Sequence, residues 1–246
     1  MTSRERVLAA VNFRQPDRVP IDLGGMKAST IAASTCARLK GRLGIATPTR
    51  VTDPRFMIAE VDEDLRGRFH LDVVPLDLSQ ILHAVQPDAR WVPHTLHDGT
   101  EVLMPPGTGL RRDPDGGLTL LAADGSPTTY RMPREGWYFD DTAFNREGRI
   151  DPAKFRPQSS VPEEHLRLLE TTARELTAST EYALLGWGFG VCFLGLSLIT
   201  DRAANVTQGM PDEWMIMLVT ERETCHEIMD RSVEATIACL GQVSEA

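Results

Sequence analysis

The chain has 246 residues, of which 41% are hydrophobic and 25% are charged. This is the composition of a globular protein with a buried core, and it excludes a chain that is disordered, collagen-like or coiled-coil throughout. The formal net charge of -9 repels phosphate backbones, and the longest basic cluster is only Arg111-Arg112, so we expect no nucleic-acid partner.

The first eighty residues predict the alternation of helices and buried strands that is typical of a parallel α/β fold. Thr2 and Glu5 have the spacing of a capping box, which starts a helix. Gly44 is the expected end of a second helix. The acidic run 60–64 is expected on the solvated face of a third helix. The expected elements are helices over 2–13, 29–43 and 54–69, and strands over 18–23 and 71–78.

Residues 84–160 interrupt this alternation with an antiparallel β-hairpin insertion and a polar connector. Aspartate-glycine pairs recur at 98–99, 115–116 and 124–125, and such pairs tolerate the positive φ angles of hairpin turns. We expect residues 91–97 to pair with 100–104, and residues 118–122 to pair with 128–132.

The α/β pattern resumes after the connector, with helices expected over 162–180, 190–202 and 210–240 and a strand over 182–187. In the last helix we expect a buried stripe of Leu218, Cys225, Met229, Val233, Ile237 and Leu240. The uncharged run 183–199 contains four glycines, which favours a buried strand followed by a helix start over a membrane span. We therefore expect no membrane partner.

Several segments resemble the uroporphyrinogen decarboxylase-like superfamily, which includes uroporphyrinogen decarboxylase and the cobalamin-dependent methyltransferases. The most specific segments are TSRERVLAAVNFRQPDRVPIDLGG at 2–25 and AEVDEDLRGRFHLDVVPL at 59–76. Further similarity follows in family order, in GWYFDD, GWGFGVCFLGLSLI and GMPDEWMIMLV. The resemblance implies a fold of the (β/α)8 TIM-barrel type. Because the insertion leaves room for only five or six βα units of roughly 30 residues, we expect an incomplete barrel. The expected organisation is a single domain over 1–246 that is C-terminally truncated and holds the N-terminal strands only.

The superfamily has two chemistries, and the resemblance favours one of them. The decarboxylase grips substrate carboxylates with arginines in an Arg-Gln-Ala-Gly-Arg pattern after its first strand, whereas this chain has Gly-Gly-Met-Lys-Ala-Ser at 24–29. The planar fork of arginine is hard to replace in bidentate carboxylate binding, which disfavours decarboxylation of uroporphyrinogen. The methyltransferases use zinc held by an H-x-C motif and a later cysteine. No H-x-C occurs in 1–246, so the resemblance implies zinc and a corrinoid for a longer parent protein.

Four residues at expected strand ends are the candidate site residues, because barrel active sites lie at the carboxyl ends of strands. Asp22 and Asp77 are candidate catalytic carboxylates. The alternatives are a turn aspartate hydrogen-bonded to backbone amides for Asp22 and a solvated loop residue for Asp77. Trp187 and Phe189 lie among glycines and are candidates to line a pocket for a flat ligand, or else they pack in the core.

Metal binding is disfavoured elsewhere in the chain. Cys225 and His226 are adjacent on a helix and point about 100° apart, while Cys225 and Cys239 are separated by about 21 Å along it. His94 and His97 flank a hairpin turn, where exposed histidines are common. We expect no metal site from these residues, because structural zinc needs four converging ligands.

The leading hypothesis is corrinoid-linked methyl transfer to a small acceptor by the full-length parent, with a corrinoid protein as a possible partner. One alternative is decarboxylation of a uroporphyrinogen-like tetrapyrrole. Another is an inactive fragment or split-barrel subunit that associates through open sheet edges. The charged start at 2–6 has no apolar signal region, and the four cysteines form no C-x-x-C, so we expect a cytoplasmic protein with free thiols.

Overall fold

The structure is a computed structural model of residues 1–246. It describes residues 1–77, 81, 91–122, 124–142, 157, 159–187 and 211–245. The chain divides into two compact units. The first contains Met1–Asp141 and Thr171–Trp187, and the second contains Thr142–Glu170 and Gly188–Ala246. The division falls within helix α5 (Glu163–Ser179). The helix predicted over 162–180 is therefore confirmed.

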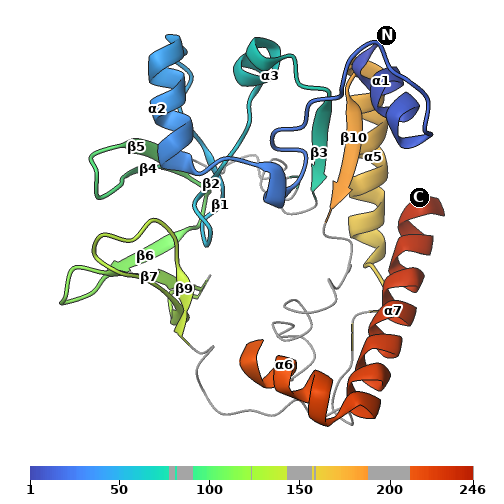
Figure 1. The fold of residues 1–246 in the computed structure, drawn as a ribbon. Coiled ribbons are helices and arrows are strands. Elements are labelled where there is room, and N and C mark those ends of the chain that lie inside the picture. Colours follow the sequence, from blue (N-terminus) through green and yellow to red (C-terminus); the bar gives the residue numbers. More distant parts are fainter. Residues whose placement is uncertain are drawn as a thin grey trace. The chain divides into compact units, whose positions relative to one another are not determined.

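Two strands form a parallel pair in the first unit. Strand β3 (Val73–Asp77) lies beside β10 (Ala183–Trp187), with Val73 opposite Ala183 and Asp77 opposite Trp187 (Figure 1). Both strands are predicted by their apolar runs, as expected for parallel strands with covered faces. The strand predictions over 71–78 and 182–187 are therefore confirmed.

The N-terminal helix α1 (Ser3–Val11) starts with the predicted capping box. The Thr2 hydroxyl accepts a hydrogen bond from Glu5 N, and the Glu5 carboxylate accepts one from Thr2 N. Arg4 then joins the helix to the chain around β10. Its guanidinium donates to three carbonyl oxygens, those of Thr177 (3.2 Å), Thr180 (2.9 Å) and Tyr182 (3.2 Å).

A buried ion-pair network lies beneath α1 and centres on Asp72, which has no exposed surface. Arg6 donates to Asp72 at 2.6 Å and to Asp17 at 2.6 Å, and Arg18 donates to both Asp72 oxygens at 2.6 and 2.9 Å. The backbone N–H of Ile21 donates to the same carboxylate at 2.8 Å. Burial acts to raise the Asp72 pKa, but the hydrogen bonds from Arg18, Ile21 and Arg6 outweigh it and hold the pKa below its ordinary value.

A short hairpin stands where the sequence predicts the start of a helix over 54–69. Strands β1 (Val51–Asp53) and β2 (Ile58–Ala59) pair antiparallel, and Met57 in the turn has a φ of 51°. Helix α3 (Glu63–Phe69) begins only after Asp62, whose carboxylate accepts from Leu65 N. The prediction is wrong for 54–62, because a proline keeps the preceding residue extended and ends β1 at Asp53.

The second predicted helix is confirmed over most of its length as α2 (Ala33–Leu43). It starts later than residue 29, because Lys27–Ser29 forms the separate 3-10 turn η1. It ends at Gly44, which has the left-handed φ of 70° expected of a glycine C-cap. Helices α2 and α3 and the β1–β2 hairpin share a core whose fully buried members include Cys36, Val51 and Leu65.

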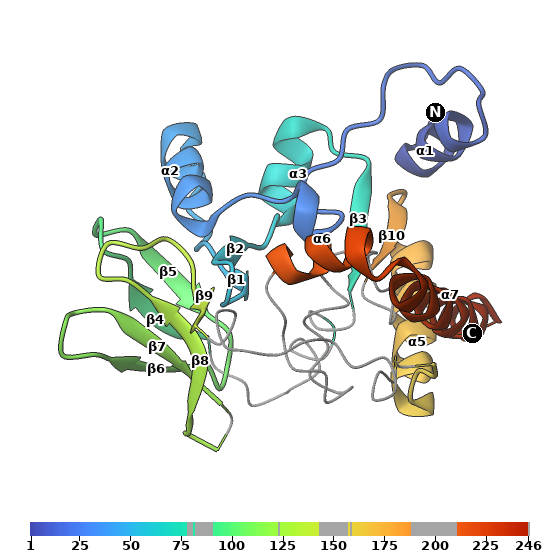
Figure 2. The same cartoon turned by 60° about the horizontal axis from the view of Figure 1, so that its bottom comes forward.

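The predicted insertion forms two antiparallel sheets (Figure 2). Strand β4 (Val92–Thr95) pairs with β5 (Glu101–Met104). A four-stranded sheet has the order β6-β7-β8-β9. Both predicted hairpins are confirmed, since β7 pairs with β8 as expected. The strands of the second sheet are β6 (Gly109–Arg112), β7 (Leu118–Leu121), β8 (Pro127–Met132) and β9 (Asp140–Asp141).

The expectation of a TIM-barrel fold, complete or incomplete, is wrong. Across the described residues the sheets have two to four strands, most pairings are antiparallel, and no barrel closes. The predicted strand 18–23 does not form. Ile21 exchanges hydrogen bonds with Asp72, but one of these uses the Asp72 side chain, and Pro20 has no N–H to continue a ladder. The described fold is mixed α/β with small sheets.

In the second unit, the helix predicted over 210–240 is two helices, α6 (Pro211–Thr220) and α7 (Arg222–Glu245). Of the predicted stripe, Cys225 is buried, Leu218 of α6 and Met229 are half-buried, and the prediction is wrong for the other three residues. Val233, Ile237 and Leu240 are exposed, and the buried residues are Cys225, Ile228, Ser232, Ala235 and Cys239. Ser232 is accommodated because its hydroxyl donates to the Ile228 carbonyl within the helix. The helix predicted over 190–202 lies outside the described residues. None of the described helices combines the length and apolar character needed to cross a membrane.

Candidate functional site

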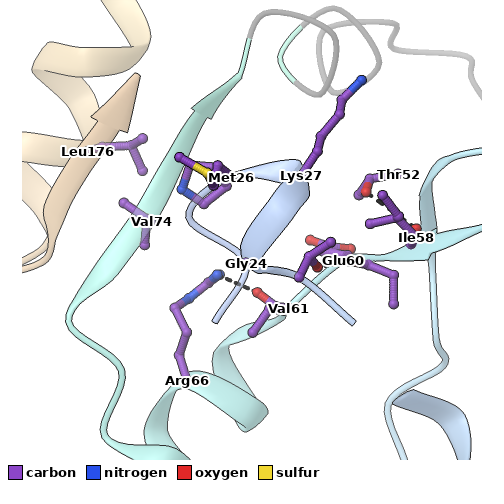
Figure 3. A pocket seen from close by; sticks show the side chains of 13 residues that line it. Gly24, Met26, Lys27, Thr52, Ile58, Glu60, Val61, Arg66, Val74 and Leu176 are labelled. Carbon is purple, nitrogen blue, oxygen red and sulfur yellow. Dashed lines mark hydrogen bonds between the residues drawn. The ribbon is translucent and has the colours of Figure 1, made fainter. Parts of the chain in front are cut away.

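The candidate site is a cavity of about 140 Å³ within the first unit (Figure 3). Val74 of β3 and Leu176 of α5 lie on one side, and Thr52, Ile58 and Glu60 of the hairpin region lie on the other. The segment from Gly24 to Lys27 passes between them. The remaining lining residues are Thr30, Ala59, Val61, Arg66 and Pro75.

Two glycines let the segment after residue 23 pack closely at the cavity. Gly24 has a φ of 87°, which favours glycine, and a Cβ there would lie 2.5 Å from a methyl carbon of Val61. A Cβ on Gly25 would lie 2.7 Å from an Asp22 oxygen and 2.9 Å from Val73. Any larger residue at these positions would therefore push the segment away from β3 and Val61.

The two cations of the cavity wall are already bonded to protein groups. Lys27 Nζ forms an ion pair of 2.9 Å with Asp53, whose other oxygen accepts from Arg55 N at 3.0 Å. Arg66 donates to Glu63 at 3.1 Å and to the Val61 carbonyl. Each of these cations therefore already lies next to a carboxylate of the protein.

The carboxylate of the cavity wall, Glu60, has fewer hydrogen-bond partners than the two cations have. Its nearest ion-pair partner is Arg50, at 3.7 Å, which is beyond hydrogen-bond distance. Arg50 itself is exposed and lies over the ring of Trp91 at 5.3 Å. The Glu60 carboxylate is therefore the acceptor of the wall with spare hydrogen-bonding capacity.

No family model, curated protein or solved structure matches the chain.

The candidate catalytic aspartates lie outside this cavity. Asp22 is exposed, and its Oδ1 accepts a hydrogen bond of 2.8 Å from Gly25 N, as an aspartate in a turn does. Asp77 is buried at the carboxyl end of β3, opposite Trp187 of β10. The side chain of Trp187 and the whole of Phe189 lie outside the described residues.

Sequence reasoning missed the cavity because it placed residues 60–64 on one helix face. Glu60 instead precedes α3 and lines the cavity, so the prediction of a solvated helix face is wrong for this residue. The Asp53-Pro54 pair was the available signal, since X-Pro favours a turn over a helix interior. A hairpin at that point would have separated Glu60 from α3.

The described residues do not fit the zinc that the resemblance implies. They contain no group of three or more histidine, cysteine or carboxylate side chains that could hold a metal. The described cysteines, Cys36, Cys225 and Cys239, are buried, and burial raises their thiol pKa values, which opposes thiolate formation. Among the histidines singled out, His94 has its pKa lowered by burial, while His97 packs edge-on against Trp137 at 4.0 Å.

Proposed function

We propose that the chain is a member of the uroporphyrinogen decarboxylase-like superfamily and that its cavity binds the small acceptor of a corrinoid-linked methyl transfer. The observation that carries this proposal is the position of residues 24–27. They stand where the resemblance expects carboxylate-binding arginines, and they pass between the two sides of the cavity with a lysine already paired to Asp53. This arrangement supports a small acceptor over a substrate held by several carboxylates.

The size of the cavity supports the same choice. Pockets that enclose drug-sized ligands have volumes of roughly 300–1,000 Å³. A cavity of about 140 Å³ is smaller than this range and suits a ligand of a few heavy atoms. A tetrapyrrole or corrin ring exceeds it, so we assign only the small reactant to this site.

The described part of the chain has no group of side chains that could hold the zinc implied by the resemblance, and the cavity is too small for a corrinoid. We therefore derive no step through either group and confine the proposal to binding of the acceptor. We also propose a cytoplasmic location, because a reducing compartment keeps cysteines such as Cys36 as thiols.

An activity assay tests the proposal directly. The chain is incubated with methylcob(III)alamin and either 2-mercaptoethanol or n-propylamine, and the methylated product is measured by mass spectrometry. We expect product to form faster than in a protein-free reaction. Product at the protein-free rate with both acceptors would reject methyl transfer. Release of carbon dioxide from uroporphyrinogen would instead support the decarboxylase alternative.

A further inference from the structure

Among the described residues of the cavity wall, Glu60 has the one carboxylate, and the side chains around it are apolar or hydrogen-bonded to other protein groups. Met26, Val61, Val74 and Leu176 contribute hydrocarbon surface. The Thr30 hydroxyl donates to the Ala59 carbonyl at 3.1 Å, and the Thr52 hydroxyl donates to the Ile58 carbonyl at 3.4 Å. Among the described residues, no side chain donates a hydrogen bond to the Glu60 carboxylate, whose closest cation is Arg50 at 3.7 Å.

Because of the neighbouring charges, a ligand can bind to the Glu60 carboxylate with less disturbance of existing ion pairs than at Lys27 or Arg66. An anionic ligand at Lys27 would lie beside the Asp53 carboxylate, which is paired to the same ammonium at 2.9 Å and is only 13% exposed, so the two anions would repel each other. It would also compete with Glu63 for Arg66. A cationic ligand breaks neither pair and supplies the missing donors to Glu60.

We propose that the cavity binds a small alkylammonium ion, with its ammonium group hydrogen-bonded to Glu60 and its alkyl chain against Met26 and Val74. The size agrees, because an apolar cavity of about 150 Å³ can hold benzene, a ligand of six heavy atoms. An ammonium ion has no lone pair, so the bound cation would first lose a proton to the Glu60 carboxylate, and the neutral amine would then be the methyl acceptor; in that respect the assignment rests on the proposed function. Binding can nevertheless be measured without any methyl transfer.

Isothermal titration of the whole chain with n-propylammonium and with propionate, at equal ionic strength, tests the proposal. The two probes have the same chain length and opposite charge. We expect n-propylammonium to bind at least about tenfold more tightly than propionate, since a charge-assisted hydrogen bond to Glu60 favours the cation alone. Tetrapropylammonium, which is too large and has no N–H donor, should not bind.

The variant Glu60→Gln should reduce the preference for the cation to less than about threefold. Glu101→Gln is the matched control, because Glu101 is an exposed carboxylate of β5 that bonds Thr95 at 2.6 Å, and it should keep the preference. If Glu60→Gln does not fold, Met26→Phe provides the second test, since the larger ring fills the cavity and should abolish binding. Equal affinity for the two probes, tighter binding of propionate, or an unchanged preference in Glu60→Gln would overturn the proposal.

The outcome is separable from that of the proposed function. Preferential binding of n-propylammonium without methylated product would retain the cation site and reject methyl transfer. Methylated 2-mercaptoethanol without cation binding would retain methyl transfer and reject the cation site.

Discussion

Replacing Asp72 by asparagine removes the centre of the network that fixes α1 and the chain around Ile21 onto β3. The carboxylate receives one hydrogen bond from Arg6, two from Arg18 and one from Ile21 N. Asparagine keeps a single oxygen acceptor and turns an NH₂ group toward guanidinium donors. Arg6 would then retain only Asp17 as a side-chain partner, and Arg18 would lose its carboxylate.

Removing one partner of a buried ion pair costs about 3–5 kcal/mol, because the other charge stays buried without compensation. For Asp72→Asn we expect a cost at the lower end of this range. The Arg18 side chain is 36% exposed and can reach water, and Arg6 keeps its bonds to Asp17. We therefore expect Asp72→Asn to lower the free energy of unfolding by about 3 kcal/mol.

Equilibrium urea denaturation followed by circular dichroism measures the loss, and hydrogen exchange shows whether it is localised. Peptides that contain α1 and β3 should exchange faster in the variant. Asp98→Asn is the control, because Asp98 is exposed and caps a turn through one oxygen that asparagine retains, so it should change stability by less than about 0.5 kcal/mol. A loss below about 1 kcal/mol for Asp72→Asn would refute the reasoning.

The same network predicts the direction of acid sensitivity. Because the Asp72 pKa is lower in the folded chain than in the unfolded chain, its contribution is present above the unfolded pKa of about 3.9 and is lost as pH falls through the folded pKa. The wild-type chain should therefore lose stability below about pH 4 more steeply than Asp72→Asn does. Parallel slopes in the two proteins would show that Asp72 is not the titrating group.

Three further substitutions test the packing and caps of the first unit by urea denaturation. Leu65→Ala should cost about 3 kcal/mol because the side chain is fully buried in α3, whereas Leu8→Ala, on an exposed side chain, should cost less than about 1 kcal/mol; equal losses would contradict the assigned core. Thr2→Ala should cost about 1 kcal/mol by removing the capping box, and Thr2→Ser should restore most of it. Gly25→Ala should cost about 1–3 kcal/mol because its Cβ would overlap Asp22 and Val73, and unchanged stability would show that the turn can shift freely.

The sequence predicted the hairpins of the first unit well because their information is local. In Asp98-Gly99 the glycine adopts a φ of 83°, and Asp98 accepts a hydrogen bond from Thr100 N. Both features are specified by residues within the turn, and alternation in the flanking segments then sets the pairing. The register of β4 and β5 follows from this turn, and no distant contact is needed to choose it.

The wrong predictions concern segments whose structure is decided by contacts that the local hydrophobic pattern does not show. Residues 18–23 have the apolar character of a strand, but the Asp72 carboxylate takes the Ile21 N–H that a neighbouring strand would need. On α7 two apolar stripes compete, and the buried one contains Ser232, which a hydrophobic pattern scores as polar. Its hydroxyl donates to Ile228 O one turn earlier in the helix, so burying Ser232 leaves no unpaired polar group. A hydrophobic pattern does not take this hydrogen bond into account.

The two segments that most strongly resemble the superfamily supply this network and also part of the cavity wall, with Gly24 from the first segment and Glu60 and Val74 among those from the second. Arg6 and Arg18 come from the first of those segments, and Asp72 comes from the second, 54 residues after Arg18. Their shared physical role is to hold α1 and the chain before Gly24 against β3. The resemblance is therefore carried both by residues that hold this part of the chain together and by residues that line the cavity.

The shape of the cavity depends indirectly on the Asp72 network, because this network fixes the chain that leads into the glycine turn. Arg18 and Ile21 fix the chain to Asp72 on one side of the glycine turn, and Lys27 fixes it to Asp53 on the other. Between these two attachments, Gly24 and Gly25 approach Val61 and Val73 too closely for any side chain. The position of the Met26 side chain in the cavity is therefore set by the hydrogen bonds and the ion pair on either side of the glycine turn. The Glu60 side chain is not among these attachments, so it can bind a ligand without contributing to the fold. Replacing Glu60 should therefore alter ligand preference, whereas replacing Asp72 should alter stability.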